Sequence, residues 1–432
     1  MDNVNSSATE FTPIPPLSEA SRIWAKIGFL SFGGPAAQIA LMHRLIVDEM
    51  KWLTEKEYLN ALSFCMLLPG PEAMQLATYA GWRLHGIAGG LIAGLLFVIP
   101  GAVIILLLAG IYASIGNIPL VEALFLGIKS AVLIVVIQAL LRIAGKSLKQ
   151  TRHRIIALIS FVGIFFLDLP FPVIVIGAAC FGMIGNPAKN DSSIATPVSN
   201  GGFRRLAMTV VLMLGIWWLP LFAIDTLSEQ KILVDMGEFF SRLAVVTFGG
   251  AYAVLAYMGQ DVVNHWGWLS AGEMMDGLGL AETTPGPLIL VTEFVGYIAA
   301  YREGGMALGI AGALVTLWVT FVPCFLWIFA GAPYIEWICA QPRLKGALSS
   351  ISAAVVGVIL NLSLWFSLHV LFAKVTRQNY GVLTLWQPDL GTIDWRVAAL
   401  TAFCGYLSFK LRWSIQRILI VSALAGVVVS YF

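Results

Sequence analysis

Long apolar runs separated by short polar stretches recur along the whole chain. Many approach the roughly 20 residues that an α-helix needs to cross a bilayer. The pattern predicts thirteen membrane-spanning helices, near 18–44, 61–82, 87–113, 119–143, 154–168, 170–186, 205–224, 237–259, 275–299, 305–332, 345–373, 395–410 and 414–431. A polar stretch at 185–202 follows the sixth of them.

Some of these runs contain helix-breaking residues where a straight membrane helix would continue. Phe-Gly-Gly occurs at 32–34 and again at 248–250, and Pro-Gly-Pro occurs at 69–71 and again at 285–287. In a helix interior Gly costs about 1 kcal/mol and Pro about 3 kcal/mol relative to Ala. We therefore predict that the helices are broken at all four segments.

The two halves of the chain share one register. Shifted by 216 residues, positions 32–71 align with 248–287 without a gap, and fourteen of these forty positions are identical. Apolar composition alone would not align Phe-Gly-Gly, Trp-Leu and Pro-Gly-Pro together. The chain therefore contains an internal repeat.

The predicted fold is an all-α polytopic membrane protein with two six-helix repeats. Because one linker helix separates the repeats, the second must start from the opposite side of the membrane, which makes the repeats inverted, as in many secondary transporters. The predicted units are the first repeat at 1–186, the linker at 187–236 and the second repeat at 237–432. Sixteen Lys and Arg residues fall on the N-terminal side of the predicted membrane against nine on the other. This excess places the N-terminus in the cytoplasm and the C-terminus outside.

Broken helices at membrane depth suit an anion. Unwound backbone there must line a cavity or be buried in protein, and each new helix N-terminus offers free N–H groups and the positive end of its dipole. Hydroxyl and amide side chains near the breaks would complete the site, with Gln38, Thr78 and Thr283 as further candidates. The predicted substrate-binding residues are Ser31, Phe32, Gly33, Gly34, Pro35, Pro69, Gly70, Pro71, Gln75, Lys129, Thr247, Phe248, Gly249, Gly250, Thr284, Pro285, Gly286 and Pro287. The alternative is that the breaks serve only close packing or a kink.

Three cationic residues within the predicted spans are functional candidates. Lys26 and Arg242 match under the 216-residue shift, and each precedes its Phe-Gly-Gly by six residues. They either attract anions to the two mouths or extend to the interface. Lys129 lies mid-span, where a charge is costly and marks a functional site by default. Glu122 is its candidate counter-ion, and a purely structural ion pair is the alternative.

Three carboxylates are candidates for proton coupling. Glu72 follows the first Pro-Gly-Pro, Glu282 precedes the second, and Glu293 lies in the next apolar run. Buried carboxylates readily exchange protons. A helix cap or an ion pair is the alternative for each of them.

The composition excludes other classes of protein. The chain is 59% hydrophobic and 12% charged, with a mean hydropathy of +0.85, which no soluble protein of this size could bury. A net charge of +2 without a basic patch gives no reason to expect a nucleic-acid partner. The cysteines form no CxxC pair, the histidines lack metal-ligand spacing, and HExxH and GxxxxGK[ST] are absent. We expect no cofactor, no metal and no enzymatic activity, and the mid-span charges argue against a non-transporting scaffold.

The paired motifs resemble the chromate ion transporter family in its long, two-domain form. They are SFGGPAAQIALMHR and WLTEKEYLNALSFCMLLPGP in the first half, and TFGGAYAVLAYMG and WLSAGEMMDGLGLAETTPGP in the second. The family's motif residues here are Phe32, Gly33, Gly34, Pro35, Trp52, Pro69, Gly70 and Pro71, with their second-half counterparts. The resemblance implies a bacterial inner-membrane protein that exports chromate and confers chromate resistance, with sulfate as the expected competitor. Transport of sulfate or another oxyanion remains the alternative, and a homodimer is left open.

Overall fold

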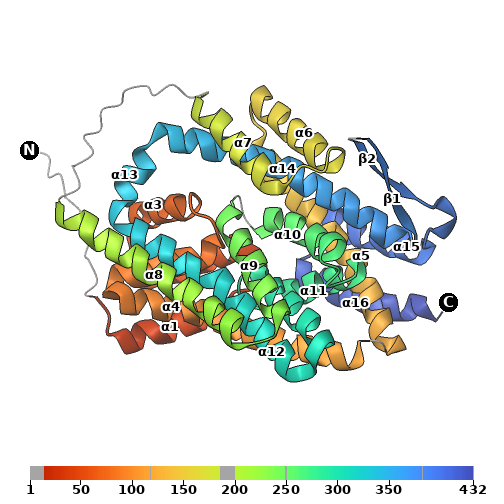
Figure 1. The fold of residues 1–432 in the computed structure, drawn as a ribbon, viewed down its shortest axis with the longest axis horizontal. Coiled ribbons are helices and arrows are strands. Elements are labelled where there is room, and N and C mark those ends of the chain that lie inside the picture. Colours follow the sequence, from red (N-terminus) through yellow and green to blue (C-terminus); the bar gives the residue numbers. More distant parts are fainter. Residues whose placement is uncertain (1–13, 117, 185–199, 249–250, 382, 432) are drawn as a thin grey trace, which may run out of the picture.

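The computed structural model describes residues 14–116, 118–184, 200–248, 251–381 and 383–431 (Figure 1). The described chain is built of helices with one short two-stranded sheet. The N-terminal tail up to residue 13, part of the polar stretch and Gly249-Gly250 lie outside the described residues.

The first half contains seven helices, and the helix after it corresponds to the predicted linker helix. They are α1 (Leu17–Leu30), α2 (Gly34–His43), α3 (Glu55–Cys65), α4 (Glu72–Ile115), α5 (Pro119–Ser147), α6 (Thr151–Phe165), α7 (Phe171–Ile184) and then α8 (Asn200–Leu227). A π-helical turn, Arg44–Glu49, extends α2. The predicted breaks at 32–34 and 69–71 are confirmed, because α1 ends before the first and α4 begins after the second.

The second half repeats this order. It contains α9 (Lys231–Val246), α10 (Ala251–Gln260), α11 (Ala271–Thr283), α12 (Val291–Gly331), α13 (Ile335–Ala340), α14 (Pro342–Leu371), α15 (Trp395–Gly405) and α16 (Ile415–Ser430). A π-helical turn, Asp261–His265, follows α10 as its counterpart follows α2. The short helices α3 and α11 both begin with capping boxes, Thr54 with Glu57 and Ser270 with Glu273, which lie 216 residues apart. The shared register is thus also a shared local structure.

Helices α4 and α12 each fold back on themselves. In α4 the turn lies at His85 and Gly86, where Gly86 has φ 63° and ψ −150°, and in α12 it lies at Gly304 and Gly305. Residues 72–84 then run antiparallel to residues 87–115, since an ideal β-carbon on Gly81 would lie 2.3 Å from the carbonyl oxygen of Gly89. Predicted spans 61–82 and 87–113 divide at this turn.

Helices of the two halves pack directly against one another. Gly90 and Gly94 of α4 face Phe329 and Phe325 of α12, so residues 87–115 and 306–331 run antiparallel. Helix α5 packs on α15 and α16, whereas α14 packs on α6 and α7. In Figure 1 the helices of the two halves are interleaved rather than gathered in separate bodies.

The outer surface is apolar in continuous stripes. Along α4 every fourth residue is large, apolar and exposed: Ile87, Leu91, Leu95, Ile99, Val103, Leu107, Ile111 and Ile115. Helix α8, which crosses the front of the molecule in Figure 1, likewise exposes Met208, Val211, Leu212, Leu219 and Phe222. Five helices among the described residues are long and apolar enough to span a bilayer. These surfaces fit a multi-pass membrane protein, while the count of thirteen spans stays a prediction.

One element departs from the all-α prediction. Strands β1 (Val375–Tyr380) and β2 (Leu383–Pro388) form an antiparallel hairpin between α14 and α15. The hairpin is attached to the α6–α7 loop, because Thr384 donates its backbone N–H to the carbonyl of Phe166 at 2.7 Å. The chain is therefore helical with one exposed hairpin.

Candidate functional site

The four helix breaks pair between the two halves, and we call them together the break junction: residues 31–33, 69–71, 247–248 and 285–287. The backbone N–H of Gly70 donates to the carbonyl of Thr247 at 2.8 Å, and the N–H of Gly286 donates to the carbonyl of Ser31 at 2.9 Å. Each bond joins the Pro-Gly-Pro segment of one half to the residue before Phe-Gly-Gly in the other. The predicted binding segments are thus brought together, and the amides of Gly70 and Gly286 are used in holding them there.

Two glutamines, both from the first half, donate hydrogen bonds to carbonyls of the break junction. Gln38 donates to the carbonyls of Ser31 at 3.1 Å and Gly286 at 2.6 Å, and Gln75 donates to the carbonyl of Pro69 at 2.7 Å. Both side-chain oxygens are buried and without a hydrogen-bond partner. Their second-half counterparts under the 216-residue shift are valines, so the two halves of the junction are chemically different.

The hydroxyl groups predicted to complete the site bond to their own helices. Ser31, Thr78 and Thr247 donate to the carbonyl four residues earlier, and Thr283 and Thr284 to the carbonyl three residues earlier. This is the common behaviour of Ser and Thr in membrane helices. Their oxygens can accept a hydrogen bond, but their hydrogens already have acceptors.

The N-terminus of α2 is the accessible part of the predicted site. Gly33 and Gly34 have φ of 86° and 78°, which glycine adopts without strain. An ideal β-carbon on Gly34 would meet nothing within 4 Å. Phe32, Gly33, Gly34 and Pro35 are half-buried. By helix geometry the first amides of α2 lack partners within the helix, so they are available to an anion. Their counterparts Gly249 and Gly250 lie outside the described residues.

Each Pro-Gly-Pro segment is seated on the long helix of the other half. An ideal β-carbon on Gly101 of α4 would lie 2.1 Å from the carbonyl oxygen of Pro285. An ideal β-carbon on Gly70 would lie 2.9 Å from Sγ of Cys324 in α12. The segments 69–71 and 285–287 are buried throughout. The contacts fix the depth of each break relative to the opposite half.

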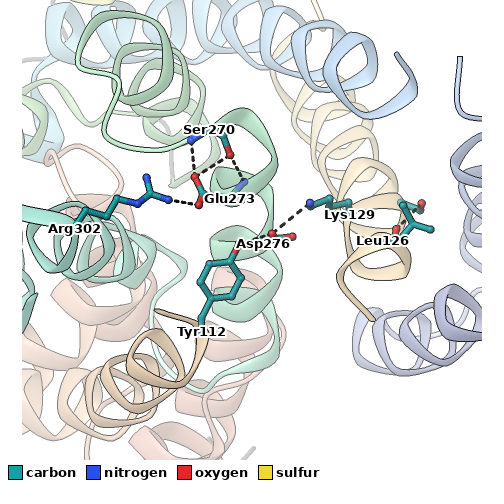
Figure 2. Close-up of polar contacts among 8 residues, drawn as sticks. Tyr112, Leu126, Lys129, Ser270, Glu273, Asp276 and Arg302 are labelled. Atoms are coloured by element: carbon teal, nitrogen blue, oxygen red, sulfur yellow. Dashed lines mark hydrogen bonds and ion pairs between the residues drawn. The ribbon is translucent and has the colours of Figure 1, made fainter. Parts of the chain in front are cut away.

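Lys129 lies apart from the break junction, and its predicted counter-ion is wrong. Its Nζ lies 3.4 Å from Oδ2 of Asp276 in α11, whereas Glu122 is exposed on α5. The same Oδ2 accepts a hydrogen bond from the hydroxyl of Tyr112 at 2.8 Å. Figure 2 shows Lys129 reaching from α5 toward Asp276, with Tyr112 arriving from α4. Sequence reasoning missed Asp276, which stands where the first half has Asn60.

Beside this cluster lies a charged framework that is present in both halves. Glu273 caps α11 through Ser270 and pairs with Arg302 of α12 (Figure 2). In the first half Glu57 caps α3 and pairs with Arg83 of α4 at 3.3 Å. These pairs tie each short helix to the adjacent fold-back turn, which is a structural role.

The three predicted proton-coupling carboxylates have different surroundings. Glu72 is the first residue of α4, where a carboxylate is favoured by the free amides. Glu282 is buried and accepts a hydrogen bond from the hydroxyl of Tyr252 at 2.7 Å. Glu293 is 1% exposed, and its Oε2 has no hydrogen-bond partner. It lies in the first turn of α12, six residues after Pro287.

The two predicted anion-attracting cations are both exposed. Arg242 pairs with Glu238 at 2.8 Å and lines a cavity of about 440 Å³ under the β-hairpin. Arg377 of the hairpin lines the same cavity and pairs with Asp168. Each guanidinium is therefore balanced by a carboxylate. Neither Lys26 nor Arg242 is part of the break junction.

Comparison with known proteins assigns the chain to a family. The family model for chromate transporters matches residues 19–183 and 234–429, which are the two halves without the linker. The chain is 28% identical to a probable chromate transport protein of Synechococcus elongatus, over 80% of this chain and 84% of that one. It is 27% identical to a chromate transport protein of Pseudomonas aeruginosa, over 98% and 94% of the two chains.

A chromate transport protein of Cupriavidus metallidurans is 25% identical over 83% of this chain and 84% of that one. No solved structure matches the chain. The family match covers most of the sequence, including all four helix breaks. The chain belongs to the chromate transporter family.

Proposed function

We propose that the protein is a secondary transporter that exports chromate from the cytoplasm of a bacterial cell through its inner membrane and thereby confers chromate resistance. The observation that carries the mechanism is the reciprocal pairing of Gly70 with Thr247 and of Gly286 with Ser31. It joins each Pro-Gly-Pro break to the Phe-Gly-Gly break of the other half, as expected for a substrate site at a repeat interface.

Inverted repeats are part of this proposal. The fold-back helices of the two halves run in opposite directions where they touch, at Gly90 with Phe329 and Gly94 with Phe325. This supports the division into repeats at 1–186 and 237–432 with a linker at 187–236. Loop charge supports a cytoplasmic N-terminus and a C-terminus outside.

The substrate would bind at the open N-terminus of α2 and pass the break junction. Gly34 leaves space for a tetrahedral oxyanion to approach the backbone. The buried glutamines at 38 and 75 hold the segments on either side. A backbone cage recognises shape and charge, so sulfate, a dianion of similar shape, is the proposed competitor.

The membrane potential supplies enough energy for export. A dianion leaving a cell that is negative inside gains about 4.6 kcal/mol per 100 mV, twice the value for one charge. This sustains a gradient on the order of a thousandfold. Coupling to protons through Glu72, Glu282 or Glu293 is the second driving force we propose, and the unpartnered Glu293 is the strongest of these candidates.

The test is flux of chromate and sulfate in proteoliposomes of known orientation. A membrane potential is imposed with potassium and valinomycin at equal pH, and a pH gradient is imposed separately. Chromate flux driven by potential alone supports an electrogenic uniporter, and flux that requires the pH gradient supports proton coupling. Sulfate flux without chromate flux would overturn the substrate and keep the fold. A Gly34→Leu variant that lacks flux but still confers chromate resistance would point to a non-transporting role.

A further inference from the structure

We propose that Asp276 is a positioning residue that holds Lys129 and competes with the transported oxyanion for its ammonium group. The inference rests on the proposed function, because it requires that an oxyanion reach Lys129. It assigns a role to a residue outside the break junction and outside the sequence-predicted site.

The geometry places the two charges at different depths. The Lys129 side chain is 28% exposed, whereas the Asp276 side chain is 4% exposed. An anion entering from the exposed side therefore meets the ammonium group before the carboxylate. The distance of 3.4 Å from Nζ to Oδ2 is long for a charge-assisted bond, and an ammonium has three donors. Lys129 thus retains the capacity to bind a second partner.

Asp276 keeps a hydrogen-bond partner when Lys129 is no longer paired with it. Its Oδ2 keeps the hydrogen bond from Tyr112 at 2.8 Å, and its Oδ1 is buried with no hydrogen-bond partner. When Lys129 turns to an oxyanion, a proton taken up from solvent on Oδ1 would remove the unpaired charge. The cluster therefore has a paired state and an anion-bound, protonated state.

The other charged groups near Asp276 already have partners of their own. On α11 itself Glu273 is engaged by Ser270, and α12 supplies Arg302, which pairs with Glu273. Helix α4 supplies Tyr112, and α5 supplies Lys129 (Figure 2). Among the described residues Asp276 is bonded by Lys129 and Tyr112, and the Glu273 carboxylate, itself paired with Arg302, acts on it through its charge.

The Lys129–Asp276 pair differs from the Glu–Arg pairs because it has no counterpart in the other half. The Glu–Arg framework occurs twice, at Glu57 with Arg83 and at Glu273 with Arg302. The Lys129–Asp276 pair occurs once, because the corresponding positions are Ser352 and Asn60. In the second half α11 packs on α5, whereas α3 of the first half packs on α4 and α13, so the pair belongs to the α11–α5 contact alone. Because charges are costly to remove from water, the presence of this pair points to a function.

Helix α11 connects the pair to the break junction. Asp276 and Thr284 are separated by eight residues, about 12 Å along a helix of α11's pitch. Lys129 lies beside Gly272 in the first turn of α11, where an ideal β-carbon would be 3.1 Å from Nζ. Helix α11 therefore runs from the Lys129 cluster at its start to the Pro-Gly-Pro break at its end.

The test measures equilibrium binding of radiolabelled sulfate to the purified full chain, from mildly acidic to mildly alkaline pH. Sulfate stays a dianion over this range, so any pH dependence comes from the protein. In the wild type we expect affinity to rise as pH falls, because protonation of Asp276 frees Lys129. In Asp276→Asn the affinity at alkaline pH should rise on the order of tenfold and become independent of pH. Asp276→Glu should restore the pH dependence.

Two further variants keep the test decisive. Lys129→Met should lose binding, and the charge-neutral Lys129→Met/Asp276→Asn variant, which leaves no unpaired buried carboxylate, should fold and bind equally poorly. Glu122→Gln, a carboxylate exposed on the same helix as Lys129, is the matched control and should behave as wild type. Wild-type binding and flux combined with an unchanged pH profile in Asp276→Asn would overturn this inference alone. Failure of the wild type to bind or move either anion would overturn the proposed function and this inference together.

Discussion

Gly101 of α4 lies so close to Pro285 of the opposite half that an ideal β-carbon at Gly101 would be 2.1 Å from the Pro285 carbonyl oxygen. The neighbour is backbone, and it belongs to a segment whose Gly286 is bonded to Ser31. A methyl group cannot be added there unless the break junction moves.

Gly101→Ala should therefore destabilise the protein and impair flux. We expect a loss of about 1–3 kcal/mol, the usual cost of overpacking a buried site. Thermal unfolding in detergent and chromate flux in proteoliposomes measure the two effects. Gly145→Ala is the control, because an ideal β-carbon at Gly145 in α5 meets nothing within 4 Å. Equal unfolding temperatures for the two variants would contradict the close packing.

Gly34 should be sensitive to backbone conformation when side chains of similar volume are compared. Its φ is 78° but the space around it is open. A β-branched residue adopts this conformation poorly, whereas Asn tolerates it better, and the left-handed region costs an ordinary residue roughly 1–2 kcal/mol. Gly34→Asn should keep more chromate flux than Gly34→Val. The reverse order would show that backbone conformation does not decide.

Substitution of Gln38 should reduce both the stability of the protein and its flux. It joins the carbonyls of Ser31 and Gly286, one from each half. Gln38→Val, which copies the second-half residue Val254, leaves both buried carbonyls with fewer donors. We expect a loss of about 1–3 kcal/mol in unfolding measurements together with reduced flux. Gln230→Val, at the exposed start of α9, is the control; no difference between the two would argue that the bonds of Gln38 are dispensable.

Glu293→Gln tests proton coupling directly. The substitution keeps the shape of the side chain but removes the exchangeable proton from a carboxyl that is 1% exposed. We expect flux driven by a pH gradient to be lost and flux driven by potential alone to persist. Glu122→Gln should change neither. A Glu293→Gln protein that still responds fully to the pH gradient would exclude Glu293 as the coupling group.

Cysteine labelling tests the proposed topology. After replacement of the exposed Cys180 and the half-buried Cys339, single cysteines at Asn379 in the β-hairpin and at Lys149 between α5 and α6 are treated with a membrane-impermeant maleimide. The loop-charge argument predicts that intact cells label at 379 and not at 149. Labelling of both from outside would overturn the predicted orientation.

The helix breaks were predictable because glycine and proline act locally. Phe-Gly-Gly and Pro-Gly-Pro mark interruptions whatever surrounds them, and the 216-residue register shows that they are paired. The fold-back at His85 and Gly86 falls in the gap between two predicted spans for the same reason. What these breaks bond to could not be predicted, because Gly70 and Thr247 are far apart in sequence.

Asp276 and the β-hairpin were missed for different physical reasons. The counter-ion of Lys129 was sought one turn or two along the same helix, where Glu122 lies, but the partner comes from a helix almost 150 residues later. The hairpin follows a span whose apolar signal dominates the region. The β-branched and aromatic residues Val375, Thr376, Tyr380, Thr384 and Trp386 on either side of Gly381 are a weak signal that could have identified it.

The exchange of helices between the halves has a consequence for biosynthesis. Gly127 of α5 packs so tightly on α16 that an ideal β-carbon would lie 1.7 Å from the Ser422 carbonyl oxygen, yet α16 leaves the ribosome long after α5. Until α16 is synthesised, this surface of α5 has no partner to cover it. Maturation is therefore a late assembly of two nascent segments, and a gene split between α7 and α8 would yield subunits that complete each other.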